Sequence, residues 1–227
     1  MSTVYNLSLG AGEFRGAGVT ELRAWQPSTL GRLDLFVKSG HTLRLASGAP
    51  STAVPRVRME PNARLENTGV LNLDGGEFSL QGTANGLTLP VFDNLGTLFG
   101  AGSVQTTRFN NNGSVLVAAG DALRIGMFGT HTGSFVAGLG SSLSFGGTFT
   151  GGANTFQTGS SLMSAGSVFA DRGSHVVNGN WDVATLEARG GSITFNSTPR
   201  IQDLRVVNSF SQASFNGAVG VLNLRLC

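Results

Sequence analysis

The sequence predicts an all-β fold in which short parallel strands stack as the coils of a β-helix, also called a β-solenoid. Three observations on the 227-residue chain predict it. A motif of the form apolar-x-Asn-x-Gly-x-apolar recurs, and a second motif of the form Gly-x-x-apolar-x-apolar recurs beside it. Between the turns, apolar residues alternate with polar ones. Repeats separated by roughly twenty to forty-five residues are typical of stacked architectures, and the frequent turns leave no room for helices of ordinary length.

The first motif occurs at residues 65–71, 92–98 and 109–115. If its Asn points inward at the same turn of successive coils, the amides can form a ladder in which each donates to the next carbonyl. The Gly two residues later is expected to supply the positive φ that a corner requires. We therefore expect a buried structural ladder made of Asn67, Asn94 and Asn111.

The second motif predicts short strands with one buried face. In each copy two apolar residues stand two positions apart, which is the period of a strand. A sandwich or a barrel would also have short, evenly spaced strands. The β-helix is favoured because the repeats are in phase with the strands, the turns use Asn and Gly instead of hairpin pairs, and the strands are too short for a barrel wall. The copies begin at Gly40, Gly75, Gly120, Gly140 and Gly190.

The regularity of these repeats divides the chain into two regions. Residues 1–60 are expected to form less regular β coils with a Pro-rich loop, which Pro50 and Pro55 mark in a stretch without Gly. Residues 61–227 are expected to form the β-helix repeat region.

The composition predicts a packed core and excludes several classes of partner. Hydrophobic residues make up 40% of the chain and charged residues 12%, so burial can offset the entropy lost on folding. The net charge is +2 and the arginines are spread singly, so nucleic-acid binding is not expected. No apolar run approaches the roughly 18 residues of a membrane helix, so no membrane insertion is expected. The first ten residues lack the basic and apolar regions of a signal peptide.

One stretch carries the residue types that catalysis on a β-helix would need. A polysaccharide lyase would use carboxylates around calcium with an Arg as base, and a hydrolase would use a pair of carboxylates. No Asp-x-Asp or Asp-Asp pair occurs, so we expect these residues to be solvated turn positions, in a chain with no catalytic, metal or cofactor site. The candidates are Asp171, Arg172, His175, Asp182 and Glu187.

Residues 109–125, 140–147 and 190–195 resemble the Gly/Asn-rich β-helical repeats of large bacterial surface proteins. These include autotransporter passengers, filamentous-haemagglutinin-type adhesins and PEP-motif-anchored exported proteins. The resemblance implies a right-handed parallel β-helix located outside the cell or on its surface. It also implies a non-enzymatic structural or adhesive role, with a polysaccharide or a host surface as ligand.

Two other functions remain open at this point. One is a β-helical polysaccharide-active enzyme, either a lyase or a hydrolase. The other is a self-assembling filament or fibre subunit, because residues 5–9 and 221–226 alternate as strands without a charged or Pro-rich cap. An uncapped strand edge pairs readily with another chain, so end-to-end self-association is expected.

Overall fold

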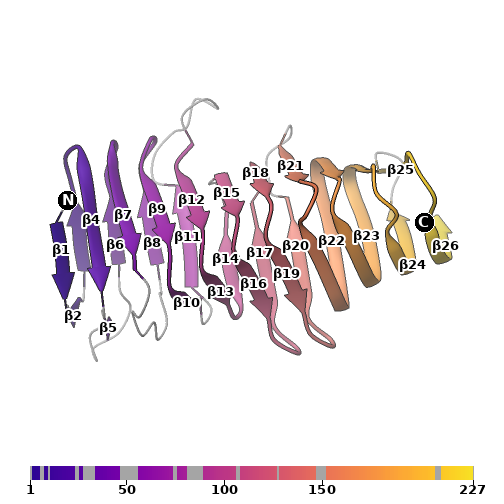
Figure 1. The fold of residues 1–227 in the computed structure, drawn as a ribbon, viewed down its shortest axis with the longest axis horizontal. Helices are drawn as coiled ribbons and strands as arrows, with labels where there is room; N and C mark the ends of the chain where they lie inside the picture. The colour runs from indigo at the N-terminus through magenta and orange to yellow at the C-terminus, as the bar shows by residue number, and fades with distance from the viewer. Residues whose placement is uncertain are drawn as a thin grey trace.

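The computed structural model shows an elongated stack of β-strands with the two chain ends at opposite ends of its long axis (Figure 1). The regular elements in the described residues are all strands, and neighbouring strands pair in parallel. The prediction of an all-β chain of stacked parallel strands is therefore confirmed. The structure describes residues 2–5, 8–9, 11–23, 26–27, 34–46, 56–73, 76–80, 89–105, 108–126, 128–146, 152–207 and 211–226.

The strands form three faces, and the chain passes over face A, face B and face C in turn. On face A each strand pairs with the face A strand of the next coil. Face A consists of β1 (Ser2–Tyr5), β4 (Gly18–Arg23), β7 (His41–Leu45), β9 (Arg64–Asn67), β12 (Val91–Asn94), β15 (Arg108–Asn111), β18 (Phe128–His131), β21 (Ala153–Phe156), residues 174–177 and 192–195, and β25 (Gln212–Phe215).

Face B follows face A after a short corner and is stacked in the same way. In its later coils the strand continues around the corner into face C, so β22 (Ser161–Val177) and β23 (Asn180–Phe195) each contribute to all three faces. Face B consists of β10 (Val70–Asn72), β13 (Thr97–Phe99), β16 (Ser114–Val117), β19 (Ser134–Ala137), residues 161–164 and 180–183, and the first residues of β24 (Arg200–Val207) and β26 (Gly220–Leu226).

Face C closes each coil before the chain returns to face A. A separate pair, β2 (Ser8–Leu9) with β5 (Gln26–Pro27), lies outside this large sheet. Face C consists of β3 (Ala11–Phe14), β6 (Asp34–Val37), β8 (Arg56–Met59), β11 (Gly76–Leu80), β14 (Gly102–Val104), β17 (Ala122–Ile125), β20 (Ser142–Phe145), residues 167–170 and 185–188, and the last residues of β24 and β26.

The inward side chains of the three faces fill the space between them with one continuous apolar core. Alternation along each strand sends every second residue inward, as the sequence period predicts. In the later coils these residues are aromatic and pack edge to face: the ring centroids of Phe145 and Phe156 are 5.0 Å apart, and so are those of Phe156 and Trp181. Fully burying each such side chain contributes about 1.5–3 kcal/mol, so the core is the main source of stability.

The Gly of the Asn motif lets neighbouring coils approach closely, because it has no side chain; it is not needed for a positive φ angle. We expected a positive φ at this position, and this is wrong for Gly96 and Gly113. Instead, a Cβ at Gly96 would lie 2.1 Å from the carbonyl oxygen of Gly69, and a Cβ at Gly113 would lie 2.0 Å from that of Gly96. Stacked corners at this spacing leave no room for any side chain.

Positive φ angles occur in the Gly that opens the second motif. The values are 77° at Gly40, 79° at Gly120 and 71° at Gly140, and an added Cβ would meet nothing within 4 Å at any of the three. These glycines are required by the left-handed backbone of a turn before a face C or face A strand. The two motifs thus use Gly for two different physical reasons.

The strands on either side of residue 60 belong to the same stack. The strand β7 pairs directly with β9, and β8 pairs directly with β11, so the sheets run without a break across this position. The Pro-rich loop predicted around Pro50 and Pro55 lies outside the described residues.

Candidate functional site

Three buried amides form a hydrogen-bonded row inside face A. The register pairs Asn67 with Asn94 and Asn94 with Asn111. Asn67 Nδ2 donates to Asn94 Oδ1 at 2.8 Å, and Asn94 Nδ2 donates to Asn111 Oδ1 at 2.7 Å. All three side chains are 0–1% exposed. The structure thus brings the predicted ladder residues together, pointing inward on consecutive coils.

The same amides hold the corners that follow them. Asn67 Nδ2 also donates to the carbonyl of Thr97 at 3.0 Å, and Asn94 Nδ2 donates to that of Ser114 at 3.0 Å. Asn67 Oδ1 accepts from Gly69 N at 3.2 Å. Each amide therefore joins its own coil to the next one through both side chain and backbone. A buried polar group is stable only when it is paired in this way.

A buried histidine ends the row of amides. His131 occupies the register position after Asn111, and its ring is fully buried, with Nε2 3.2 Å from Asn154 Oδ1. Asn154 is in register with His175, whose ring is also buried. Burial lowers the pKa of each histidine to about 4, so both are neutral near pH 7. Among the described residues, His131 Nδ1 has no hydrogen-bond partner.

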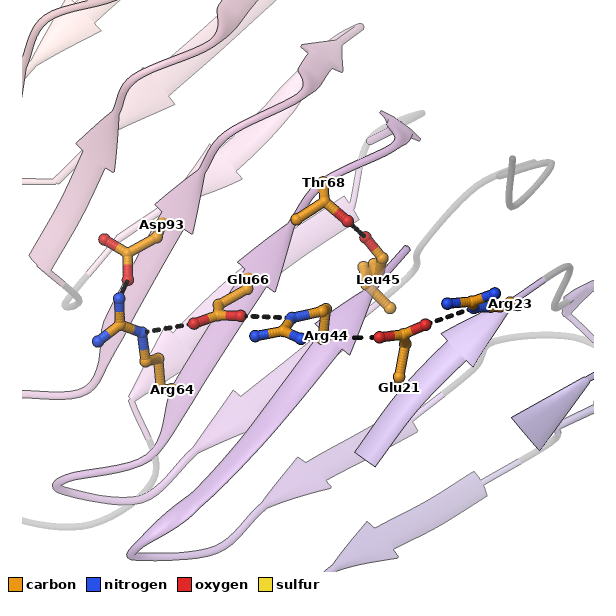
Figure 2. A network of polar contacts seen from close by, with 8 residues as sticks. All are labelled: Glu21, Arg23, Arg44, Leu45, Arg64, Glu66, Thr68 and Asp93. Atoms are coloured by element: carbon orange, nitrogen blue, oxygen red, sulfur yellow. Dashed lines mark hydrogen bonds and ion pairs between the residues drawn. The ribbon is translucent and has the colours of Figure 1, made fainter. Parts of the chain in front are cut away.

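The outward side of face A carries a row of alternating acids and arginines, shown in Figure 2. Arg44 lies between two carboxylates, with Nε 2.7 Å from Glu66 and Nη1 3.6 Å from Glu21. Arg64 continues the row, with Nε 3.1 Å from Glu66 and Nη2 2.8 Å from Asp93. The acids are the more buried partners, and the neighbouring Glu66 raises the pKa of the Arg44 guanidinium.

A shallow, open groove runs beside this row at the corner between faces A and B. Its volume is about 500 Å³. The polar groups along it already bind one another: Glu21 binds Arg23 at one end, and the Thr68 hydroxyl donates to the carbonyl of Leu45 at 3.0 Å (Figure 2). The groove is therefore a charge-balanced surface that is open to solvent. It is lined by Glu21, Arg23, Arg44, Ala46, Glu66, Thr68 and Leu95.

The five residues considered for catalysis do not meet in one place. Asp171 and Glu187 point outward from neighbouring strands of face C. Asp182 lies on face B in register with Met163, and His175 is inside the core on face A. Arg172 stands at a corner with a φ of 30°. The expectation of solvated turn positions is wrong for His175, which is buried in a strand, whereas Arg172 and Asp182 are exposed.

The two carboxylates that share face C are both bound by arginines. Glu187 Oε1 lies 2.6 Å from Arg189 Nε, and Asp171 Oδ2 lies 4.0 Å from Arg124 Nη2. Partial burial raises the pKa of Asp171, while the guanidinium of Arg189 lowers it. The guanidinium of Arg189 also lies 3.8 Å above the ring of Phe169, a cation–π contact that orients it.

An exposed amide row at the corner between faces A and B was missed in the sequence. Asn196 Nδ2 donates to Asn178 Oδ1 at 2.8 Å, and Asn216 Nδ2 donates to Asn196 Oδ1 at 2.7 Å. A sequence pattern could have predicted this row, because each Asn directly follows the last inward apolar residue of a face A strand. This row resembles the buried one in chemistry but lies in solvent.

Comparisons with family models, with curated proteins and with solved structures returned no match. Within the described residues, no group of three or more His, Cys, Asp or Glu side chains is placed to hold a metal ion. No helix among those residues is long and apolar enough to cross a membrane.

Proposed function

We propose that this chain is a non-enzymatic, right-handed β-solenoid that serves as a structural or adhesive segment of a bacterial surface or secreted protein. One observation carries the proposal: a single packed core and uninterrupted parallel sheets run through all the described coils. Such a stack is a rigid rod whose faces repeat every roughly 4.8 Å, which suits it to bearing load and presenting a long surface. Its place is outside the cell or on the cell surface.

The state of the carboxylates supports a non-enzymatic role. General acid–base catalysis needs a carboxyl group that exchanges a proton near working pH. In this chain, eight described carboxylates lie within 4.0 Å of an Arg or Lys nitrogen, so each already has a cationic partner. They are Glu13, Glu21, Glu60, Glu66, Asp93, Asp171, Glu187 and Asp203.

The ligand we propose is an extended polymer, either a polysaccharide or a component of a host surface. The groove beside the ion-pair row supports this, because its acids and guanidiniums present donors and acceptors along the stack. The near balance of charge speaks against nucleic acid, whose binding needs a basic stripe. Membrane insertion is not part of the proposal.

A binding and turnover screen tests this function. The chain is incubated with immobilised polysaccharides and extracellular-matrix proteins, and the same polymers are assayed for new reducing ends and unsaturated uronates, with and without calcium. We expect retention on at least one polymer without any product. Turnover that is lost in Asp171→Ala or Glu187→Ala would overturn the proposal in favour of the polysaccharide-active enzyme.

A second candidate, a filament subunit, is favoured by the last coil. In β26 the side chains of Leu222, Leu224 and Leu226 are 79%, 62% and 77% exposed. Leu224 is in register with the buried Leu204, so it stands where the core of the next coil would begin. We propose that a further coil covers this end, supplied by end-to-end association with another copy. Light scattering under reducing conditions tests it: Leu224→Glu should abolish growth of large species.

A further inference from the structure

The outward side of face B carries a row of exposed apolar side chains that is not part of the core. It contains one residue from each of four consecutive coils, all pointing outward and in register. Leu116 is 41% exposed, Val136 42% and Met163 59%, and Phe99 at the start of the row is half-buried. A contiguous apolar patch on a soluble protein marks an interaction site.

A row of hydroxyls runs parallel to the apolar row, two residues earlier on each strand. It consists of Thr97, Ser114, Ser134 and Ser161, and Ser134 Oγ donates to Ser114 Oγ at 3.1 Å. Across these four coils neither row contains a charged residue. The surface is therefore regular and uncharged over its centre.

The apolar row is symmetric about its midpoint between Leu116 and Val136. On the N-terminal side it is preceded by Asn72, and on the C-terminal side it is followed by Asp182. If a second copy is turned about a two-fold axis that lies parallel to the strands and between β16 and β19, apolar residues meet apolar residues along the whole row. Asp182 then meets the polar side chain of Asn72 of the partner subunit and not a second carboxylate.

The same rotation also matches the hydroxyl row to itself, because it keeps positions along the strand unchanged. Thr97 comes opposite Ser161, and Ser114 comes opposite Ser134, so hydroxyls face hydroxyls that can both donate and accept. The other two-fold axis, parallel to the stack, would place Asp182 opposite its own copy. Like charges facing each other cost affinity, so the first axis is favoured.

We propose that face B is the contact surface of a two-fold dimer of this chain, with the two solenoids antiparallel and the apolar rows of both copies stacked on each other. From Asn72 to Asp182 the matched row spans about 24 Å, five strand spacings. A strip of that length and two rows wide buries less area than a standard specific interface, so the dimer is a weak one that forms at high local concentration. This inference does not depend on the proposed function.

Sedimentation velocity over a concentration series, with reducing agent present, provides the first test. In a Leu224→Glu background, which blocks end-to-end growth, we expect a monomer–dimer equilibrium, and a dissociation constant at least about tenfold higher when Leu116→Glu or Val136→Glu is added, because each would bury an unpaired charge. Both side chains are exposed in the monomer, so circular dichroism should show an unchanged fold. Leu226→Glu, on the end coil, is the matched control and should leave the dimer unchanged. A chain that stays monomeric, or a dimer that survives both face B variants, would overturn the proposal.

Cysteine cross-linking tests the geometry directly. In the proposed dimer Phe99 faces Met163 of the partner subunit, whereas within one molecule the two positions are three strands, or about 14 Å, apart. Sheets packed face to face lie about 10 Å apart, a gap that a short bis-maleimide spans but a disulfide, which needs Cα atoms within about 7 Å, does not. In a Cys227→Ser background, Phe99→Cys combined with Met163→Cys should therefore give a covalent dimer with this cross-linker, and each single variant should not. Failure of the double variant to cross-link, or equal cross-linking of the single variants, would refute the antiparallel arrangement.

Discussion

One position of the coil is filled in two different ways along the molecule. In three consecutive coils the inward residue at this position of face A is an amide, at Asn67, Asn94 and Asn111. In the coil before them it is Leu45, and in the later coils it is again apolar, as in Phe156 and Phe195. The backbone pairing is the same in both regions, so either filling is compatible with the stack. The amides specify which strand lies next to which, because a slipped neighbour would leave them unpaired. The aromatic rings contribute more burial and less specificity.

The boundary between these two regions lies at His131. Its ring follows the last amide in register and contacts the aromatic ring that holds this position in the next coil, with its centroid 4.7 Å from that of Phe156. Gly129 provides the room, since a Cβ there would lie 2.8 Å from His131 Cε1. The aromatic region thus begins with a titratable group in its core. The amide region contains no titratable side chain in its row, and the two regions should respond differently to mutation and to acid.

The largest effect is expected from removing the middle amide. Asn94→Leu leaves a donor of Asn67, the acceptor of Asn111 and the carbonyl of Ser114 without a partner. At about 1–3 kcal/mol for each unsatisfied group, we expect a loss of roughly 3–9 kcal/mol in the free energy of unfolding. Chemical denaturation measures it, with Phe156→Leu as the matched apolar change in the other region. That control should cost less, about 1–3 kcal/mol.

Acid should destabilise the aromatic region by a similar amount. The pKa of each buried histidine is lowered to about 4 in the folded state, against 6.5 as its ordinary value. Between these two values the unfolded chain binds more protons, so stability falls as the pH drops from 6.5 towards 4. The loss approaches roughly 3 kcal/mol per histidine. Thermal melts across this window test it, and His175→Leu should remove about half of the pH dependence. A melting temperature that stays constant from pH 7 to pH 4.5 would contradict the burial of neutral rings.

A smaller difference is expected between the two kinds of glycine. Gly113→Ala would push a methyl group into the carbonyl of Gly96, and overpacking of this kind costs about 1–3 kcal/mol. In Gly120→Ala the new methyl group meets no atom within 4 Å, so the only loss of stability comes from placing Ala at a positive φ, about 1 kcal/mol. Denaturant melts of the two variants side by side would show the order. If Gly120→Ala were the more damaging, close stacking of the corners would not be the reason for the Gly in the Asn motif.

The smallest effect is expected on the surface. Arg44→Ala removes the guanidinium between Glu21 and Glu66, yet ion pairs open to solvent contribute only about 0–1 kcal/mol. We expect a change below about 1 kcal/mol that shrinks further in high salt. A larger loss would mean that the ion-pair row, and not only the buried amides, holds the earlier coils together.

The inward amides could be predicted from the sequence because the same apolar-x-Asn-x-Gly-x-apolar motif surrounds each of them. It could not predict the rows on face B, since the coils differ in length: 27 residues separate Asn67 from Asn94, and only 17 separate Asn94 from Asn111. With unequal coils, no fixed period brings Leu116 and Met163 onto one line. His175 illustrates a different limit, because a histidine near charged residues gives no sign that its own side chain turns inward. The face B rows and the inward orientation of His175 both depend on the register between coils, which only the folded chain defines.

Hydrogen exchange at two pH values tests the central claim most directly, since it follows the two regions separately within one molecule. Solenoids open coil by coil, so local protection reports local stability. The account predicts that, between pH 7 and about pH 5, backbone amides in residues 153–177 lose protection while those in residues 91–117 keep theirs. Equal loss in both regions, or earlier loss in residues 91–117, would contradict the claim that amides and aromatic rings hold the same position by different means.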